Sequence, residues 1–298
     1  INKKLYPFFF TWHDIGNIEG YIKTKEKFSN TKEVFNFEKK NEYLYFVEDK
    51  VIKYFSDKNI IKKRFLRAKS LKGLCPIVNL KTDFFYSYEK VDGKILYDQK
   101  NPVIISKLLS WLDKNLWIKK TLEKSKNNDF KIECKKIYFD KTKDRLNTYF
   151  EKYSLKDVPQ KINGTRIDAT SNLMSKIDWE WMSDGIPSQF HGDLQFENIL
   201  ISKNNSFTLI DWRQDFSDNL DHGDMYYDLA KLNGGINVSY KNIKRNLFSY
   251  KKVDNDITIS TVLDPFLEES KKIFDDYLNQ KNLDIKKIEN LTGLIFLN

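Results

Sequence analysis

Residues 190–200 read FHGDLQFENIL and place Asp193 and Asn198 on either side of a short loop. Asn198 opens an apolar run, NILIS, that reads as a buried strand; a second run, FTLID, ends at Asp211 after the polar turn KNNS. If the two strands pair as a hairpin, Asn198 and Asp211 meet at one end. Amide and carboxylate oxygens side by side suit Mg²⁺, and Asp193 beside them is free to accept a proton.

This arrangement is the one that phosphoryl transfer needs, with a metal on the phosphates and a carboxylate that orients an attacking hydroxyl. Each residue also has an ordinary interpretation: Asp193 could cap a turn, Asn198 could satisfy a backbone group, and Asp211 could cap a helix. The combined spacing, with His-Gly before the loop and Ile-Asp-Trp on the second strand, favours the functional interpretation.

Upstream of the loop, the pattern predicts strands and then helices. Aromatic and β-branched runs predict strands from residue 34 to 55, at 75–80 and at 84–91, with a helix over 60–71 that Ser56 or Asp57 caps. Beyond the turn VDGK, helices are expected from Asn101-Pro102, over 141–153 and through most of the last eighty residues. The expected fold class is therefore α+β, with a small β-rich lobe and a larger, mostly helical lobe. Nucleotide sites often lie in the crevice between two such lobes.

The basic composition does not by itself indicate nucleic-acid binding. The 298-residue chain has a net charge of +9, but only six of its 51 basic residues are Arg, the residue that phosphate and base recognition favours. One stretch, residues 60–73 (IIKKRFLRAKSLKG), is strongly basic with helical apolar spacing. It is read as a solvated helix face, with anion binding as the alternative.

Other classes of protein find little support in the composition. No apolar run is long enough to span a bilayer. Cys75 and Cys134 lie far apart, and with three His residues no zinc site can be written. A reducing, cytoplasmic environment is the default expectation.

The motifs carry a family resemblance. HGDLQFENIL followed by LIDW, and then GDMYYDLAKL at 223–232, resembles the signature of the aminoglycoside phosphotransferase and choline kinase-like family. The resemblance implies a two-lobed protein-kinase-like fold, ATP with Mg²⁺, and a small-molecule alcohol as acceptor. It also implies the roles of the motif residues: Asp193 is the catalytic base, His191 braces the catalytic loop, Asn198 and Asp211 hold magnesium, and Asp224 and Asp228 support the loop.

The expected small lobe, residues 31–95, fits this family less closely. Lys53 is the candidate for the strand lysine that contacts the ATP phosphates, with Lys50 as its rival. No Gly-rich loop precedes it, and the helix over 60–71 has no Glu or Asp to pair with it. Backbone groups around Glu89 and Val91 occupy the position of the hinge that would hold adenine. The larger lobe, residues 96–298, is expected to be truncated at its C-terminal end.

The first thirty residues resemble a different family. The segment TWHDIGNIEGYIKTKEKFS, residues 11–29, is similar to the end of sugar-phosphate nucleotidyltransferase domains, although it could be an ordinary leading helix. The resemblance implies an intact protein with a fused upstream nucleotidyltransferase domain, of whose site Asp14 is a remnant. The kinase product would then become a nucleotide-linked precursor of a surface polysaccharide.

The identity of the acceptor stays open at this stage. Six aspartates between Asp211 and Asp228, set against Arg213, would suit a cationic acceptor such as choline, and three aromatic side chains could face its ammonium group (Trp212, Tyr226 and Tyr227). The preferred interpretation is instead that these aromatics are core and that the aspartates line a solvent loop. Two further functions remain as alternatives: phosphorylation of aminoglycoside-type antibiotics, and a catalytically impaired nucleotide-binding module.

Overall fold

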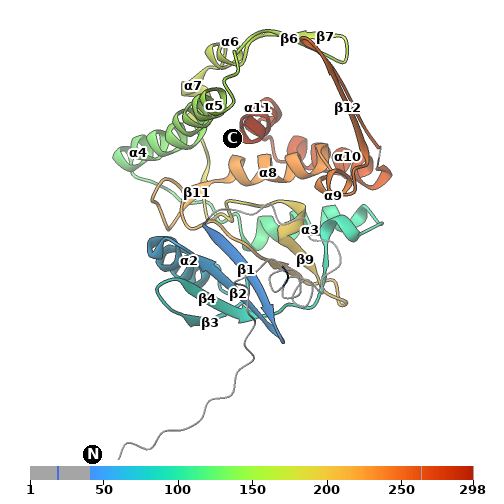
Figure 1. Ribbon diagram of the computed structural model, residues 1–298. Coiled ribbons are helices and arrows are strands. Elements are labelled where there is room, and N and C mark those ends of the chain that lie inside the picture. Colours follow the sequence, from blue (N-terminus) through green and yellow to red (C-terminus); the bar gives the residue numbers. More distant parts are fainter. Residues whose placement is uncertain (1–18, 20–40, 263, 298) are drawn as a thin grey trace, which may run out of the picture. The chain divides into compact units, whose positions relative to one another are not determined.

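The computed structural model describes residue 19 and residues 41–262 and 264–297, which Figure 1 shows coloured along the chain. The segment that resembles a nucleotidyltransferase, including Asp14, lies outside the described residues except for Glu19. So do residues 34–40, where the first strand of the small lobe is expected. Residues 40–298 form one compact unit, and the boundary expected at residues 95–96 stays a prediction.

The β-rich part begins with a four-stranded antiparallel sheet. Its order is β1 (Glu42–Val47), β2 (Lys50–Phe55), β4 (Phe85–Glu89) and β3 (Val78–Lys81). Helix α2 (Lys58–Ser70) follows β2, and the Asp57 carboxylate caps it by accepting a hydrogen bond from the backbone N–H of Asn59 at 2.8 Å. The strands and the helix lie where the aromatic and apolar patterns predicted them.

The hairpin after the loop forms as expected. Strand β9 (Ile199–Ile201) pairs with β10 (Phe207–Leu209) in antiparallel register, with Ile199 opposite Leu209. Its other edge pairs with β5 (Lys94–Ile95), which leads into the short helix η1 (Leu96–Asp98). Asn198 does not open the strand, as was predicted, but closes the 3₁₀ turn η3 (Phe196–Asn198) just before it.

Helices make up most of the remaining chain. The predicted helices correspond to α3 (Val103–Asn115) and α5 (Lys141–Lys152). Helix α8 packs against α10 and α11, and α10 packs against α3. The other helical segments are α4 (Lys124–Lys135), the π-helical turn η2 (Lys136–Asp140), α6 (Thr170–Ser175), α7 (Trp179–Ser183), α8 (Met225–Asn237), α9 (Tyr240–Lys244), α10 (Pro265–Gln280) and α11 (Ile285–Leu297).

Four strands interrupt this helical part where helix was expected or no element was assigned. They form a sheet in the order β12 (Phe248–Val253), β13 (Asp256–Thr261), β6 (Gln160–Ile162) and β7 (Thr165–Ile167) (Figure 1). The tight turn at Asp254, whose φ is +52°, joins β12 to β13. The last eighty residues are mostly helical, as expected, but residues 248–261 form this hairpin instead. A short pair, β8 (Pro187–Ser188) and β11 (Gly223–Asp224), brackets the loop region.

A continuous hydrophobic core joins the sheet to the helices. The Trp212 ring is fully buried, and its centroid lies 6.0 Å from that of Tyr86 and 6.3 Å from that of Tyr88, both on β4. The expected α+β class, with a β-rich N-terminal part and a helical C-terminal part, is confirmed. No helix in the described part of the chain has the length and apolarity to cross a membrane.

Candidate active site

The loop that starts at His191 is held by one buried carboxylate. The two oxygens of Asp228, on α8, accept hydrogen bonds from the backbone N–H groups of His191 and Gly192, each at 2.7 Å. Burial raises the pKa of Asp228 to about 6. Gly192 has a φ of +87°, and a Cβ there would lie 2.6 Å from Cβ of Arg213, so no larger residue fits without a shift. The loop conformation therefore depends on both glycine and Asp228.

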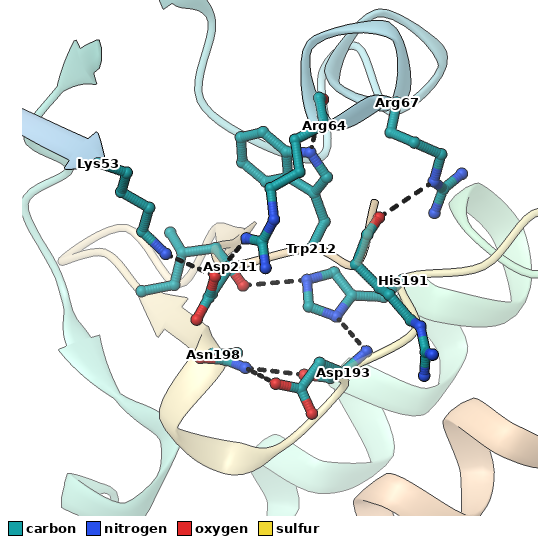
Figure 2. Close-up of polar contacts among 10 residues, drawn as sticks. Lys53, Arg64, Arg67, His191, Asp193, Asn198, Asp211 and Trp212 are labelled. Carbon is teal, nitrogen blue, oxygen red and sulfur yellow. Dashed lines mark hydrogen bonds and ion pairs between the residues drawn. The ribbon is translucent and has the colours of Figure 1, made fainter. Parts of the chain in front are cut away.

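The imidazole of His191 joins this loop to the end of the hairpin. Its Nδ1 accepts a hydrogen bond from the backbone N–H of Asp193 at 3.2 Å, and its Nε2 lies 3.0 Å from the carbonyl oxygen of Ile210 (Figure 2). Because a carbonyl can only accept, the ring carries its proton on Nε2 and is neutral. Complete burial lowers its pKa to about 4, which agrees with that state. The geometry suits the bracing role expected of His191.

Asp193 is the partly exposed carboxylate of the loop, with 34% of its side chain accessible. Its Oδ2 accepts a hydrogen bond from Asn198 Nδ2 at 3.2 Å, and its Oδ1 lies 2.9 Å from Nζ of Lys231 on α8. A second bond from Asn198 Nδ2, to the backbone oxygen of Asp193, measures 2.8 Å. The carboxylate is thus oriented by its neighbours and still open to solvent, as a base that receives a hydroxyl proton must be.

Asn198 and Asp211 lie on adjoining ends of the hairpin, as the spacing predicted. The backbone N–H of Ile210 donates to the carbonyl oxygen of Asn198 at 2.9 Å, and Asp211 follows with a φ of +58°. Oδ1 of Asn198 and Oδ2 of Asp211 have no hydrogen bond within the described part of the chain. Two hard oxygens of this kind fit Mg²⁺, whose other ligands are usually water and phosphate oxygens.

The carboxylate of Asp211 is already shared between two cations. Oδ1 lies 2.5 Å from Nζ of Lys53 on β2 and 2.6 Å from Nη1 of Arg64 on α2 (Figure 2). Burial opposes the charge of Asp211, but the two cations outweigh it and hold its pKa well below the usual range. Burial likewise opposes the charge of Lys53, and Asp211 raises the pKa of that lysine above its usual value. Lys50, the rival candidate, is exposed at the start of the strand, so the geometry favours Lys53.

The predicted solvated face of helix α2 holds for its lysines, since Lys62 and Lys69 are exposed, but is wrong for its arginines, which are buried. Arg67 is fully buried, donates to the carbonyl oxygen of Phe190 and stacks with its guanidinium carbon 3.8 Å from the Phe190 ring centroid. The indole Nε1 of Trp212 donates to the carbonyl oxygen of Arg64 at 2.9 Å. The two arginines therefore fix the helix against the loop and the hairpin, and Arg64 pairs with Asp211, the carboxylate that also pairs with Lys53.

Other predicted residues occupy supporting positions. Asp224 is buried and accepts hydrogen bonds from the Tyr138 hydroxyl at 2.6 Å and from two backbone N–H groups, of Ile186 and Tyr226. Glu89 ends β4 and accepts a hydrogen bond from Asn79, and Val91 follows where the chain leaves the sheet. The adenine-binding role of this segment stays a prediction.

Three aspartates of the acidic segment form ion pairs with lysines, and two of them, Asp218 and Asp221, are nevertheless exposed to solvent. Lys63 pairs with Asp215 at 2.8 Å and with Asp218 at 2.5 Å, and Lys120 pairs with Asp221 at 3.1 Å. The three aromatics of the segment are buried, at 0%, 7% and 5% exposure for Trp212, Tyr226 and Tyr227. Their assignment to the core is confirmed. The aspartates, however, do not simply line a solvent loop.

Comparison with known proteins supports the resemblance carried by the motifs. Residues 129–237 match the model of the phosphotransferase enzyme family, a segment that contains the loop, the hairpin and α8. The expected relationship to that family is thereby confirmed for this segment. No curated protein matches the chain.

Solved structures with a similar fold are distant. An ethanolamine kinase of Plasmodium vivax shares 14% identity at a TM-score of 0.45, covering 96% of this chain and 81% of its own. A choline kinase of Streptococcus pneumoniae shares 14% identity at a TM-score of 0.38, covering 94% and 98%. At these values neither likeness carries an argument about the substrate.

Proposed function

We propose that the protein is an ATP- and Mg²⁺-dependent phosphotransferase that phosphorylates a hydroxyl group of a small molecule. The observation that carries the proposal is the placement of Asp193, Asn198 and Asp211 around one loop, within the segment that matches the phosphotransferase family. Lys53 from the sheet reaches the same carboxylate that would hold the metal.

In this proposal the loop residues act through position and charge. Asp193 accepts the proton of the acceptor hydroxyl, and His191 and Asp228 hold the loop that carries it. Lys53 would exchange its contact with Asp211 for one with the nucleotide phosphates. Asn198 and Asp211 would hold Mg²⁺, which when bound neutralises the charge of the phosphates.

The first prediction concerns the base. Asp193→Asn removes the proton acceptor while keeping the shape of the side chain, so kcat should fall by roughly 10²- to 10⁴-fold. ATP affinity should change little. The change in kcat is measured by ADP release with a panel of sugars, polyols, amino-alcohols and aminoglycosides. The ATP affinity is measured by equilibrium binding. Asp254→Asn, in the exposed turn between β12 and β13, is the matched control.

The same experiment separates the alternatives. A catalytically impaired module, the reading favoured by the absence of an acidic residue on α2, would bind ATP yet show no Asp193-dependent transfer to any alcohol. An antibiotic phosphotransferase would prefer aminoglycosides within the panel. The role in surface-polysaccharide precursor synthesis depends on the N-terminal segment, and expression of the intact gene product with assays of both activities would test it.

A further inference from the structure

Four basic residues lie within electrostatic reach of one another beside the Asp193 loop, and the sequence pattern singled out none of them as acceptor ligands. They are Lys141 and Arg145 on α5, Arg213 after the hairpin and Lys231 on α8, referred to below as the basic cluster. None of them belongs to the metal-binding pair or to the Lys53 contact. Their position beside the catalytic base makes them neighbours of whatever molecule offers its hydroxyl to Asp193.

Two members of the cluster flank the base directly. Nζ of Lys231 lies 2.9 Å from Oδ1 of Asp193. The side chain of Arg213 runs along Gly192, the residue before Asp193, close enough that a Cβ on that glycine would collide with it. Nη1 of Arg213 donates to the Tyr227 hydroxyl at 3.1 Å, and both cations lie within 6 Å of the Tyr227 ring centroid, at 5.8 Å and 5.9 Å.

Lys141 is carried to the cluster by an irregular helix. The π-helical turn η2 precedes it, and such turns are frequent at functional sites. The same turn stacks Tyr138 on Tyr227, with ring centroids 6.0 Å apart. Lys141 is half-buried and has no ion pair within the described residues. Burial, and then the positive charges of Arg213, Arg145 and Lys231, lower its pKa to about 7.

Among the described residues, no carboxylate forms an ion pair with Lys141 or Arg213, and Lys231 pairs with Asp193 itself. Asp211 forms ion pairs with Lys53 and Arg64, and Asp215 forms one with Lys63. Asp228 accepts hydrogen bonds from two backbone N–H groups. Asp193 is the carboxylate that raises the pKa of Lys141 against the lowering by burial and by the other three cations of the cluster. Lys141 and Arg213 are therefore the two cations near the base that an anionic group of the acceptor could reach.

We propose that the acceptor alcohol carries an anionic group, a carboxylate or a phosphate, which the basic cluster binds while the hydroxyl faces Asp193. The inference rests on the proposed phosphotransferase function. Arg and Lys side chains at a partly buried site bind such groups through charge-assisted hydrogen bonds, whereas an ammonium group would be repelled. In the reaction the bond between the γ-phosphorus and the ADP oxygen breaks, a bond from that phosphorus to the acceptor oxygen forms, and the hydroxyl proton passes to Asp193.

A competing use of the cluster is to bind the phosphates of the nucleotide. The two uses predict different responses to the charge of the acceptor. A cluster that binds the nucleotide affects all acceptors equally, whereas a cluster that binds the acceptor discriminates among them by charge.

The test uses acceptors that share a three-carbon backbone. Glycerol, glycerate and glycerol 3-phosphate differ in charge, and choline provides a cation. With the wild-type protein, kcat/KM for glycerate or glycerol 3-phosphate should exceed that for glycerol by about tenfold or more, given the strength of charge-assisted hydrogen bonds, and choline should be the poorest. Comparison of the two anions separates carboxylate from phosphate as the recognised group.

Raising the NaCl concentration should raise KM for the anions and leave that for glycerol nearly unchanged.

Variants of α5 then test whether Lys141 causes the preference for anionic acceptors. Lys141→Gln should lower kcat/KM for the preferred anion by about tenfold and leave glycerol within about twofold. Lys143→Gln, at an exposed position on the same helix, is the matched control and should keep the preference. The melting temperature of each variant shows whether it folds, and the salt dependence of the wild-type protein provides a test that needs no variant.

Three results would overturn the inference. An equal loss for glycerol and the anions in Lys141→Gln would assign the cluster to the nucleotide. A preference for choline or for neutral alcohols would refute the anionic acceptor and leave the phosphotransferase function intact. Absence of Asp193-dependent transfer to alcohols of any charge would instead refute the proposed function, and this inference with it.

Discussion

Single residues in the loop are specified by their backbone and burial. Gly192 adopts a backbone conformation that other residues rarely take. The Asp228 carboxylate accepts hydrogen bonds from the backbone N–H groups of His191 and Gly192. His191 stays neutral because it is buried and because its two ring nitrogens have partners of opposite kind. The loop before Asp193 is thus held without any charge on the imidazole.

The buried imidazole should make folding sensitive to acid. The pKa of His191 is about 4 in the folded protein and 6.5 in an unfolded chain, so the unfolded state binds the proton first. The neutral imidazole stabilises the folded protein fully above pH 6.5. As the pH falls toward 4 this stabilisation is lost, which lowers the free energy of unfolding by up to about 3 kcal/mol. Urea unfolding of the wild-type protein and of His191→Asn across pH 4–7 measures it.

The difference between the pH profiles of the wild-type protein and His191→Asn isolates the effect of the imidazole. The pKa of Asp228, raised to about 6, contributes in the opposite direction, because its stabilisation is lost as the pH rises from about 4 to 6. That contribution is common to both proteins. Parallel pH profiles for wild type and His191→Asn would show that the imidazole is not the titrating group.

Helix α2 is the element that connects the sheet to the active-site loop. It follows the strand that carries Lys53, and it reaches the hairpin through Arg64, Arg67 and the indole of Trp212. Asp211 is bound by one cation from the strand and one from the helix. The element therefore couples the position of the expected phosphate-binding lysine to that of the expected metal ligand.

Shortening the indole should loosen this connection. Trp212→Phe removes the indole hydrogen bond to the carbonyl oxygen of Arg64 and part of the buried ring volume, which together should cost about 2–4 kcal/mol in the free energy of unfolding. Thermal and denaturant unfolding measure the loss. Trp111→Phe, on α3 and only partly buried, should cost less; equal losses in the two variants would contradict the anchoring role.

Across the whole molecule, the metal and the nucleotide should act as one stabilising ligand. Mg²⁺ would bind the carboxylate that now faces Lys53 and Arg64, and the phosphates of ATP offer those two cations a new partner. ATP with Mg²⁺ at about a hundredfold above its dissociation constant should raise the melting temperature by about 5 °C or more. ATP with EDTA should raise it less, and transfer should stop.

The variant Asp211→Asn tests the metal part of this effect. Asparagine tolerates the positive φ of this position, so the backbone is kept while the carboxylate is lost. The unliganded variant should be less stable by about 3 kcal/mol, because two buried cations lose their partner. The extra rise caused by Mg²⁺ over EDTA should disappear in it but persist in Asp254→Asn. A rise of the same size in Asp211→Asn would place the metal elsewhere.

Local patterns in the sequence determined much of the fold and the centre of the site. The hairpin, the helix after β2 and the grouping of Asp193, Asn198 and Asp211 follow from short-range spacing, because a turn of fixed length leaves few ways to pair two strands. The β12–β13 hairpin was not predicted, because the helical pattern on either side of it dominated. A local signal was present, since the two residues between its strands, Asp254 and Asn255, are turn formers.

Only the tertiary structure decided the partners of the charges. The acidic segment pairs with lysines and arginines up to 158 positions away, and the basic stretch on α2 is partly buried rather than solvated. One signal was present: three of only six arginines, at positions 64, 67 and 213, make contacts within the site. Sequence spacing determines which charges share a strand or a helix face. It does not determine which opposite charge, brought from another element, neutralises them, and that is why the cations near Asp193 could not be placed from the acidic sequence around it.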